Sequence, residues 1–296
     1  MTPTVLVGVD GSPGSTAAAH WAAEEALRRD APLRLVHAWP WLTDGRSAFV
    51  DEDALPAAAQ RMLAETADAV RADRPGLVVH TDVVLDAAVD GLLAAAGDAG
   101  LLVLGSRGLG GFTGLLVGSV GTATAARSGV PVVLVRPERE PVREPARQRP
   151  GGPTEVIVGV DTAAPDDSVL AFAFRAAALR GARLRAVHGW DLPPAFGSVG
   201  FAPIPPDAVG LEKLQAEALT MALAGWRERH PGTAGVEVVE DVRVGAARAL
   251  VEASATAGLV VLGRRRRPHD LGPRLGRVAH AVLHHAQAPV AVVPHD

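Results

Sequence analysis

The sequence predicts an α/β protein of two tandem doubly wound domains, each with a five-stranded parallel sheet in the order 3-2-1-4-5. The first observation is an internal repeat, because VLVGVD at 5–10 returns as VIVGVD at 156–161. The second is that short apolar runs alternate with longer amphipathic ones, as strands joined by helices do. Such strands form a parallel sheet with helices on both faces and right-handed crossovers.

Three further landmarks recur in the same order along the chain. They are VHAW at 36–39 and VHGW at 187–190, LLVLG at 101–105 and LVVLG at 259–263, and VPVV at 130–133 and APVA at 288–291. We therefore interpret the chain as a duplication with a first domain at 1–137, a linker at 138–153 and a second domain at 154–296. The linker is rich in Pro, Arg and Glu without an apolar period, which is typical of an extended connection.

The elements of the first copy follow from local patterns. A β-rich apolar run at 4–9 predicts a buried strand, and a helix starting at Ser15 gathers small and apolar residues on one face. The run at 33–38 predicts a second strand, followed by a long connection. The remaining elements alternate in the same way: helix 54–71, strand 78–85, helix 86–96, strand 101–104, a Gly-rich loop at 105–117, helix 118–127 and strand 132–135.

The amino-acid composition excludes several classes of protein and of binding partner. Of 296 residues 48% are hydrophobic, enough for a core in each domain. A net charge of −4 argues against a general affinity for nucleic acid or anionic membrane. The absence of cysteine excludes disulfides and thiolate metal sites. No apolar stretch approaches the roughly 18 residues of a membrane span, so we expect a cytoplasmic protein.

The Gly-rich loop is the candidate for chemistry. It reads GSRGLGGFTGLLVGSV at 105–120 and leads into a helix. Glycines let backbone amides approach an anion closely, and a helix N-terminus favours phosphate. A polyphosphate along this loop is one interpretation, and a surface loop with a Ser-capped helix is the other. The P-loop is excluded because the sole lysine, Lys213, follows Glu212 on a helix, and Gly11 to Gly14 do not match GxGxxG.

These residues resemble the universal stress protein family, whose nucleotide signature is Gly-x2-Gly-x9-Gly-Ser/Thr. Gly105, Gly108, Gly118 and Ser119 match it without a gap, and the opening strand ends in Gly8-x-Asp10. The resemblance covers both copies. It implies a Rossmann-like fold of the adenine nucleotide alpha hydrolase type, with ATP as the ligand and Mg as an optional companion.

The resemblance also implies roles for individual residues. Asp10 is expected beside the adenosine and the backbone of Ala38 against adenine. The last strands of two such domains are expected to pair edge to edge, here within one chain, and a homodimer is a further expectation. The expected site of the first domain comprises Gly8, Asp10, Ala38, Gly105, Ser106, Arg107, Gly108, Leu109, Gly110, Gly111, Gly118, Ser119 and Val120.

The second copy departs from the signature. Arg266 replaces the second glycine and Arg277 the serine. If Gly108 has a left-handed backbone, an arginine there costs about 1–2 kcal/mol, and Arg277 removes a capping hydroxyl. The corresponding site residues are Gly159, Asp161, Gly189, Gly263, Arg264, Arg265, Arg266, Gly276, Arg277 and Val278.

Two interpretations of the arginine run at 264–267 stay open. The guanidinium groups bind phosphates, or the run is a solvated face of an empty site. Either way we expect tighter ATP binding in the first domain than in the second.

Other constellations have structural explanations. His280 and His284 lie four apart on the last helix and could form a metal pair, but no acidic third ligand is evident, so we expect no metal site. We expect His37 and His188 to pack or to make a hydrogen bond at the ends of buried strands. Asp166 and Asp167 suit the N-terminus of a helix.

The sequence favours an ATP-binding regulatory protein of stress physiology over two alternatives. One alternative is a slow ATP hydrolase or phosphotransferase, for which Arg107 could supply charge but no convincing base is visible. The other is a dimerisation scaffold that binds no nucleotide. The stress signal and the effector protein cannot be read from the chain.

Overall fold

The structure is a computed structural model, and it describes residues 3–39, 54–106, 108, 117–137, 155–190, 207–233, 235–266 and 275–296. The described residues up to 137 belong to one compact unit, and residues 155–266 and 276–296 belong to a second. We call these unit 1 and unit 2 and describe each by itself. The predicted linker at 138–153 lies outside the described residues.

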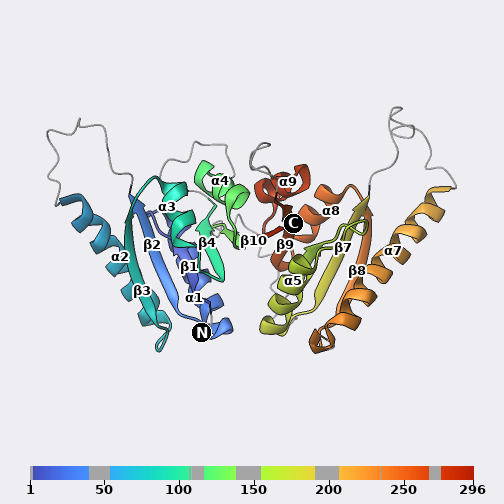
Figure 1. Ribbon diagram of the computed structural model, residues 1–296, viewed down its shortest axis with the longest axis horizontal. Helices are drawn as coiled ribbons and strands as arrows, with labels where there is room; N and C mark the ends of the chain where they lie inside the picture. The colour runs from blue at the N-terminus through green and yellow to red at the C-terminus, as the bar shows by residue number, and fades with distance from the viewer. Residues whose placement is uncertain are drawn as a thin grey trace, which may run out of the picture. The chain divides into compact units, whose positions relative to one another are not determined.

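Unit 1 alternates strands and helices as the sequence predicts. Its elements are β1 (Val5–Gly8), α1 (Pro13–Arg29), β2 (Leu33–Trp39), α2 (Ala54–Asp73), β3 (Val79–Leu85), α3 (Ala88–Ala95), β4 (Leu101–Gly105), α4 (Ser119–Arg127) and β5 (Val132–Val135). The strands pair in parallel in the order β3-β2-β1-β4-β5, which confirms the predicted order. Helices α1 and α2 pack on one face of the sheet and α3 and α4 on the other (Figure 1).

Unit 2 repeats this arrangement. Its elements are β6 (Glu155–Gly159), α5 (Asp167–Arg180), β7 (Leu184–Trp190), α7 (Asp207–Arg229), a 3₁₀ turn (Pro231–Thr233), β8 (Val238–Val244), α8 (Ala246–Ala253), β9 (Ala257–Arg265), α9 (Arg277–His285) and β10 (Val290–His295). The parallel order is β8-β7-β6-β9-β10, again the predicted one. Helices α5 and α7 share one face, and α8 and α9 the other (Figure 1).

The core of each unit lies on both faces of the central strands. Every residue of β1 and β5 is buried, because helices cover both faces of the sheet there. On α1 the buried positions are mostly alanine, including Ala18, Ala22 and Ala26. Such small side chains let the helix backbone come close to the sheet. Among the described residues, no helix combines the length and apolar character that crossing a bilayer needs.

The start of α1 differs slightly from the prediction. The helix begins at Pro13, two residues before the predicted Ser15, because Ser12 caps it. The Ser12 hydroxyl accepts a hydrogen bond from the Ser15 amide at 3.1 Å. A proline at the first helical position suits the helix, because its fixed φ is already helical and its missing N–H has no helical partner.

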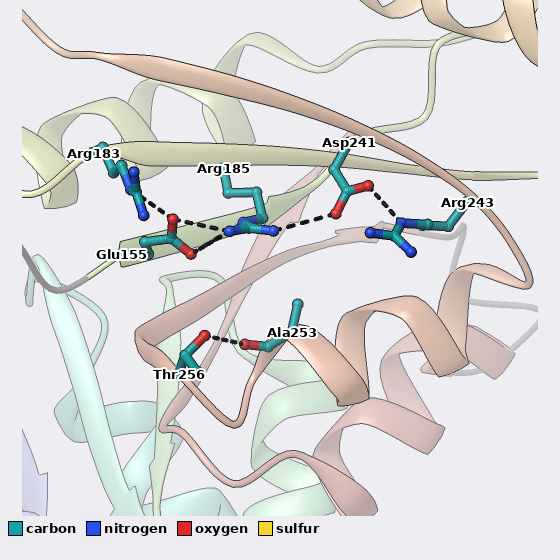
Figure 2. Close-up of polar contacts among 7 residues, drawn as sticks. All are labelled: Glu155, Arg183, Arg185, Asp241, Arg243, Ala253 and Thr256. Carbon is teal, nitrogen blue, oxygen red and sulfur yellow. Dashed lines mark hydrogen bonds and ion pairs between the residues drawn. The ribbon is translucent and has the colours of Figure 1, made fainter. Parts of the chain in front are cut away.

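The two units differ in the charges that join their strands. In unit 1, Arg34 of β2 pairs with Asp82 of β3. In unit 2 the corresponding pair, Arg185 and Asp241, belongs to a larger network (Figure 2). Arg185 donates to both carboxylate oxygens of Glu155 at 3.0 Å each. Glu155 is 4% exposed, so its charge is balanced almost wholly by arginines.

Two further arginines complete this network in unit 2. Arg183 Nε lies 2.6 Å from Glu155 Oε1, and Arg243 Nε donates to Asp241 Oδ1 at 2.6 Å (Figure 2). The hydrogen bond to Glu155 raises the pKa of Arg185 above its usual value, against an opposing effect of burial. The network therefore ties β6, β7 and β8 together through ion pairs.

Candidate functional site

The carboxyl ends of β1 and β4 meet at the centre of the unit 1 sheet. These strands are hydrogen-bonded neighbours, with Val7 opposite Val103. β2 and β3 follow on one side and β5 on the other, so the strand order reverses here. In open α/β sheets the crevice at such a reversal is the usual ligand site. Asp10 follows β1, and Gly105 ends β4, so both border this crevice.

Asp10 organises the turn between β1 and α1. Its Oδ1 accepts hydrogen bonds from the Ser12 amide at 3.0 Å and from the Ser12 hydroxyl at 2.6 Å. The Asp10 amide in turn donates to the Ser15 hydroxyl at 3.3 Å. Gly11, between them, has a left-handed backbone with φ +80°. The aspartate therefore closes an Asx-type turn. Its second carboxylate oxygen, Oδ2, faces Gly108.

Gly108 lies beside the Asp10 carboxylate. A β-carbon built on Gly108 would lie 2.5 Å from Asp10 Oδ2. A side chain at position 108 has no room, because the Asp10 carboxylate occupies the place of its β-carbon.

Gly105 is required by the approach of α1. A β-carbon there would lie 2.6 Å from the carbonyl carbon of Gly14 and 2.9 Å from the amide nitrogen of Ser15. Both atoms are backbone, so neither can rotate away. Gly105 therefore lets the end of β4 touch the first turn of α1.

The two ends of the Gly-rich loop are joined at the start of α4. The Ser106 amide donates to the Val135 carbonyl at 2.7 Å, and the Gly118 amide donates to the Ser106 carbonyl at 2.7 Å. Gly118 is the N-cap of α4, and within the described part of the chain no side chain caps this helix. The Ser-capped helix that the sequence suggested is thus not what forms. The first-turn amides at Ser119 and Val120 carry no acidic residue beside them.

Two predicted site residues also serve the packing of α3. A β-carbon on Gly8 would meet Leu104 at 2.5 Å and Leu92 at 3.0 Å. One built on Gly91 of α3 would lie 3.2 Å from the Ala38 β-carbon. Small residues at 8 and 38 thus keep this helix close to the sheet. Four other predicted residues, Arg107, Leu109, Gly110 and Gly111, lie outside the described residues.

Two neighbours of the crevice were missing from the predicted set. His37 Nδ1 lies 2.6 Å from the Val9 carbonyl, so the histidine joins β2 to the residue before Asp10. This confirms the expected hydrogen bond at the strand end. Met62 of α2 places its sulfur against Gly11. The sequence marks Met62 merely as part of an amphipathic helix, and no local pattern connects it to the turn.

In unit 2 the corresponding crevice is built differently. Asp161 still accepts from the amide two residues on, Ala163, at 3.1 Å. However, α5 begins at Asp167 and is capped by Asp166, as expected of these two acids. Asp166 Oδ2 also lies 3.3 Å from His295 Nδ1. His295 Nε2 is 2.8 Å from where a β-carbon on Gly263 would stand, so a histidine lies where α1 approaches β4 in unit 1.

The strand before the unit 2 loop is longer than its counterpart. β9 continues to Arg265, which pairs with His295 of β10, and the Arg266 amide donates to the His295 carbonyl at 2.5 Å. The side chain of Arg264 is buried. Burial lowers the pKa of its guanidinium, and Arg266 lowers it further. Arg265 and Arg266 are exposed, and Arg267 lies outside the described residues.

The remaining predicted residues of unit 2 hold its helices. A β-carbon on Gly159 would meet Leu262 at 2.9 Å, and one on Gly189 would overlap Ala246 at the start of α8. Gly276 is the N-cap of α9, whose first two residues are Arg277 and Val278. As in α4, no described side chain caps this helix. The replacement of Ser119 by Arg277 therefore removes no cap.

A polar cluster closes the side of the unit 2 crevice next to α7. The buried His188 has Nδ1 2.9 Å from the Val160 carbonyl and Nε2 2.9 Å from Gln215 Oε1, with the Thr162 hydroxyl 3.4 Å away. The buried residues of α7 follow one another at the same spacing as those of α2, so the two helices can be aligned. In this alignment Gln215 of α7 corresponds to Ala59 of α2. Unit 2 thus has a hydrogen-bonding side chain at a position where α2 of unit 1 has a buried alanine.

His280 and His284 lie on one side of α9. The rings of His280 and His284 are 4.5 Å apart between centroids, and those of His284 and His285 are 6.4 Å apart. Across the described residues, no three histidine, aspartate or glutamate side chains come together in a way that could hold a metal ion.

Fold and site together define a tandem α/β protein whose two doubly wound units carry unequal crevices at the same topological position. The sequence pattern of the Universal stress protein family matches residues 1–136 and again residues 154–294. The chain belongs to the universal stress protein family.

Individual relatives agree with this assignment. A universal stress protein of Mycobacterium tuberculosis is 36% identical, covering 97% of this chain and 96% of its own. Another from Mycolicibacterium smegmatis is 37% identical, with coverage of 98% and 96%. A universal stress protein from Archaeoglobus fulgidus shares the fold, with a TM-score of 0.66 at 18% identity over the whole of both chains.

Proposed function

We propose that unit 1 is an ATP-binding module through which this cytoplasmic protein regulates a response to stress. The observation that carries the proposal is the junction between the end of β4 and the start of α4, where the Gly118 amide donates to the Ser106 carbonyl. Its four signature residues, Gly105, Gly108, Gly118 and Ser119, lie at the switch point of the sheet. Free amides at a helix start, together with a glycine-lined approach, are what a polyphosphate needs.

The arrangement of the crevice supports this orientation of the nucleotide. The phosphates would lie along the loop and against the start of α4, where the Ser119 hydroxyl adds a donor. The adenosine would lie toward Asp10 and the end of β2. A Mg²⁺ ion would travel with the phosphates, because magnesium in nucleotide sites is held largely by phosphate oxygens and water.

The same reasoning makes unit 2 the weaker site. His295 lies against Gly263, β9 runs on as a strand to Arg265, and Arg266 replaces the glycine of the loop. Arg264 is buried and therefore not displayed to a ligand in solution. We propose that ATP binds tightly to unit 1 alone. Pairing of the two units, a homodimer and the effector protein stay predictions.

Titration calorimetry with Mg·ATP on the full chain tests the proposal. We expect one tight site per chain. Gly108→Glu should abolish it, because the new side chain and the Asp10 carboxylate compete for one space. Gly129→Glu is the matched control, since a β-carbon at Gly129 meets nothing within 4 Å. Mass spectrometry of nucleotide released from the purified, denatured protein identifies the natural ligand. Full affinity in Gly108→Glu, or no binding by the parent, would contradict the proposal.

A further inference from the structure

The thioether of Met62 touches the turn that carries Asp10. A β-carbon built on Gly11 would lie 3.0 Å from Met62 Sδ and 3.7 Å from Met62 Cγ, and these are the two described atoms within 4 Å of that point. Met62 lies in the middle of α2, a helix that contacts α1 and β2 as well as β3. The helix and the turn are therefore in direct contact through one sulfur-bearing side chain.

The turn has little freedom to move away from this sulfur. Its backbone is held by the hydrogen bonds of Asp10 to Ser12, and Ser12 in turn caps α1. Gly11 has φ +80°, a conformation fixed by these contacts on both sides. A larger or more polar group at this sulfur must therefore move the Met62 side chain off the turn, displace α2, or break the hydrogen bonds of the turn.

Met62 is open to small reagents. Its side chain is partly exposed, whereas the core positions of α2, such as Leu63 and Ala67, are buried. The chain has no cysteine and three methionines. Met221 on α7 is 75% exposed and belongs to unit 2, outside the domain that carries Asp10. It provides an internal comparison for the same chemistry.

We infer that Met62 is an oxidation site through which peroxides weaken nucleotide binding by unit 1. The peroxide transfers one oxygen atom to Sδ: a sulfur–oxygen bond forms, the oxygen–oxygen bond breaks, and water leaves. The thioether loses two electrons and the peroxide gains them. The sulfoxide is polar and chiral, so it no longer packs against Gly11, and methionine sulfoxide reductases reverse the change.

The inference rests on the proposed function, and calorimetry with Mg·ATP after treatment with hydrogen peroxide tests it. Peptide mass spectrometry measures oxidation at each methionine. We expect oxidation of Met62 to lower the ATP affinity about five-fold or more, and reductase treatment to restore it. Met62→Leu, a volume-conserving change, should keep its affinity under peroxide, while Met221→Leu should lose it as the parent does. Unchanged ATP affinity with Met62 fully oxidised would overturn the inference. It would also be overturned if Met62 stayed unoxidised after peroxide treatment that oxidises Met221.

A second measurement separates this inference from the ATP proposal. Hydrogen exchange of the amides of Gly11, Ser12, Gly14 and Ser15 reports on the turn without any ligand. Exchange should rise in the oxidised parent and stay constant in oxidised Met62→Leu. If the untreated parent binds no ATP, the proposed function fails, and the coupling of Met62 to the turn is then decided by exchange alone. Equal exchange before and after oxidation would refute that coupling.

Discussion

Asp10 and Gly108 share one space at the centre of unit 1, with Oδ2 of the aspartate 2.5 Å from the place of a glycine β-carbon. Gly108→Ala should therefore push the carboxylate aside and weaken ATP binding. A misplacement of this size at a binding constellation costs on the order of tenfold or more. Titration calorimetry measures the change.

A second substitution shows whether the carboxylate is the cause. Asp10→Ala alone should also weaken binding, because the turn loses its hydrogen bonds to Ser12. The double variant should lose less than the sum of the two single losses, since residues in contact are not additive. Gly129→Ala is the control, as it adds a methyl group in open space. Strict additivity would show that the two positions act independently.

Gly105→Ala tests a different requirement, the contact between β4 and α1. The added methyl group would lie 2.6 Å from backbone atoms of Gly14, so the strand or the helix must shift. Overpacking of this kind destabilises by about 1–3 kcal/mol. We expect the thermal transition of unit 1 to fall while that of unit 2 stays in place. Hydrogen exchange resolves the two transitions by residue. A variant as stable as the parent would mean that the contact relaxes freely.

The charge network of Figure 2 predicts that removing a carboxylate lowers the free energy of unfolding more in unit 2 than in unit 1. Glu155→Gln leaves Arg185 and Arg183 without their buried carboxylate. Removing one partner of a fully buried pair costs about 3–5 kcal/mol, and we expect about 2 kcal/mol here because solvent reaches both arginines. Asp82→Asn in unit 1 breaks a more exposed pair and should cost at most about 1 kcal/mol. Denaturant unfolding measures both. Equal effects would show that the network adds nothing.

The contribution of Arg185 to stability should not depend on pH in the neutral range. The hydrogen bond to Glu155 raises the pKa of Arg185 above its usual value. A group whose pKa is raised by folding stabilises the protein fully below its unfolded pKa and loses that effect as the pH rises through the folded value. Between about pH 6 and pH 9 the cost of Arg185→Gln should therefore stay constant. A steep change in this window would point to another titrating group.

The strand order was predictable from the alternation of strands and helices, and most helix bounds followed from local patterns, although α1 begins two residues before its predicted start. Apolar runs such as 101–105 and 132–135 are too short for helices and too apolar for loops, and the repeat fixed their alignment. The hydrogen-bonding role of His37 and His188 also followed from their place at strand ends. These features depend on neighbours in sequence.

The parts that could not be predicted depend on contacts between distant segments. The steric role of Gly108 arises from Asp10, nearly a hundred residues away, so its sequence context suggested backbone conformation instead. The contact of Met62 with Gly11 and that of His295 with Gly263 have the same origin. A single sequence also gave no sign that β9 would continue past Gly263.

That longer strand yields the last prediction. If side-chain identity alone made unit 2 the weaker site, Arg266→Gly with Arg277→Ser would restore the signature and the affinity. We expect ATP binding by unit 2 to stay weak in this double variant. The His295 ring still lies against Gly263, and the His295 carbonyl still accepts from the amide of residue 266. Calorimetry in a Gly108→Glu background isolates the second unit. Adding His295→Ala should then improve binding, since it clears the space beside Gly263. Tight binding by the restored signature without that third change would show that β9 and His295 do not obstruct the crevice.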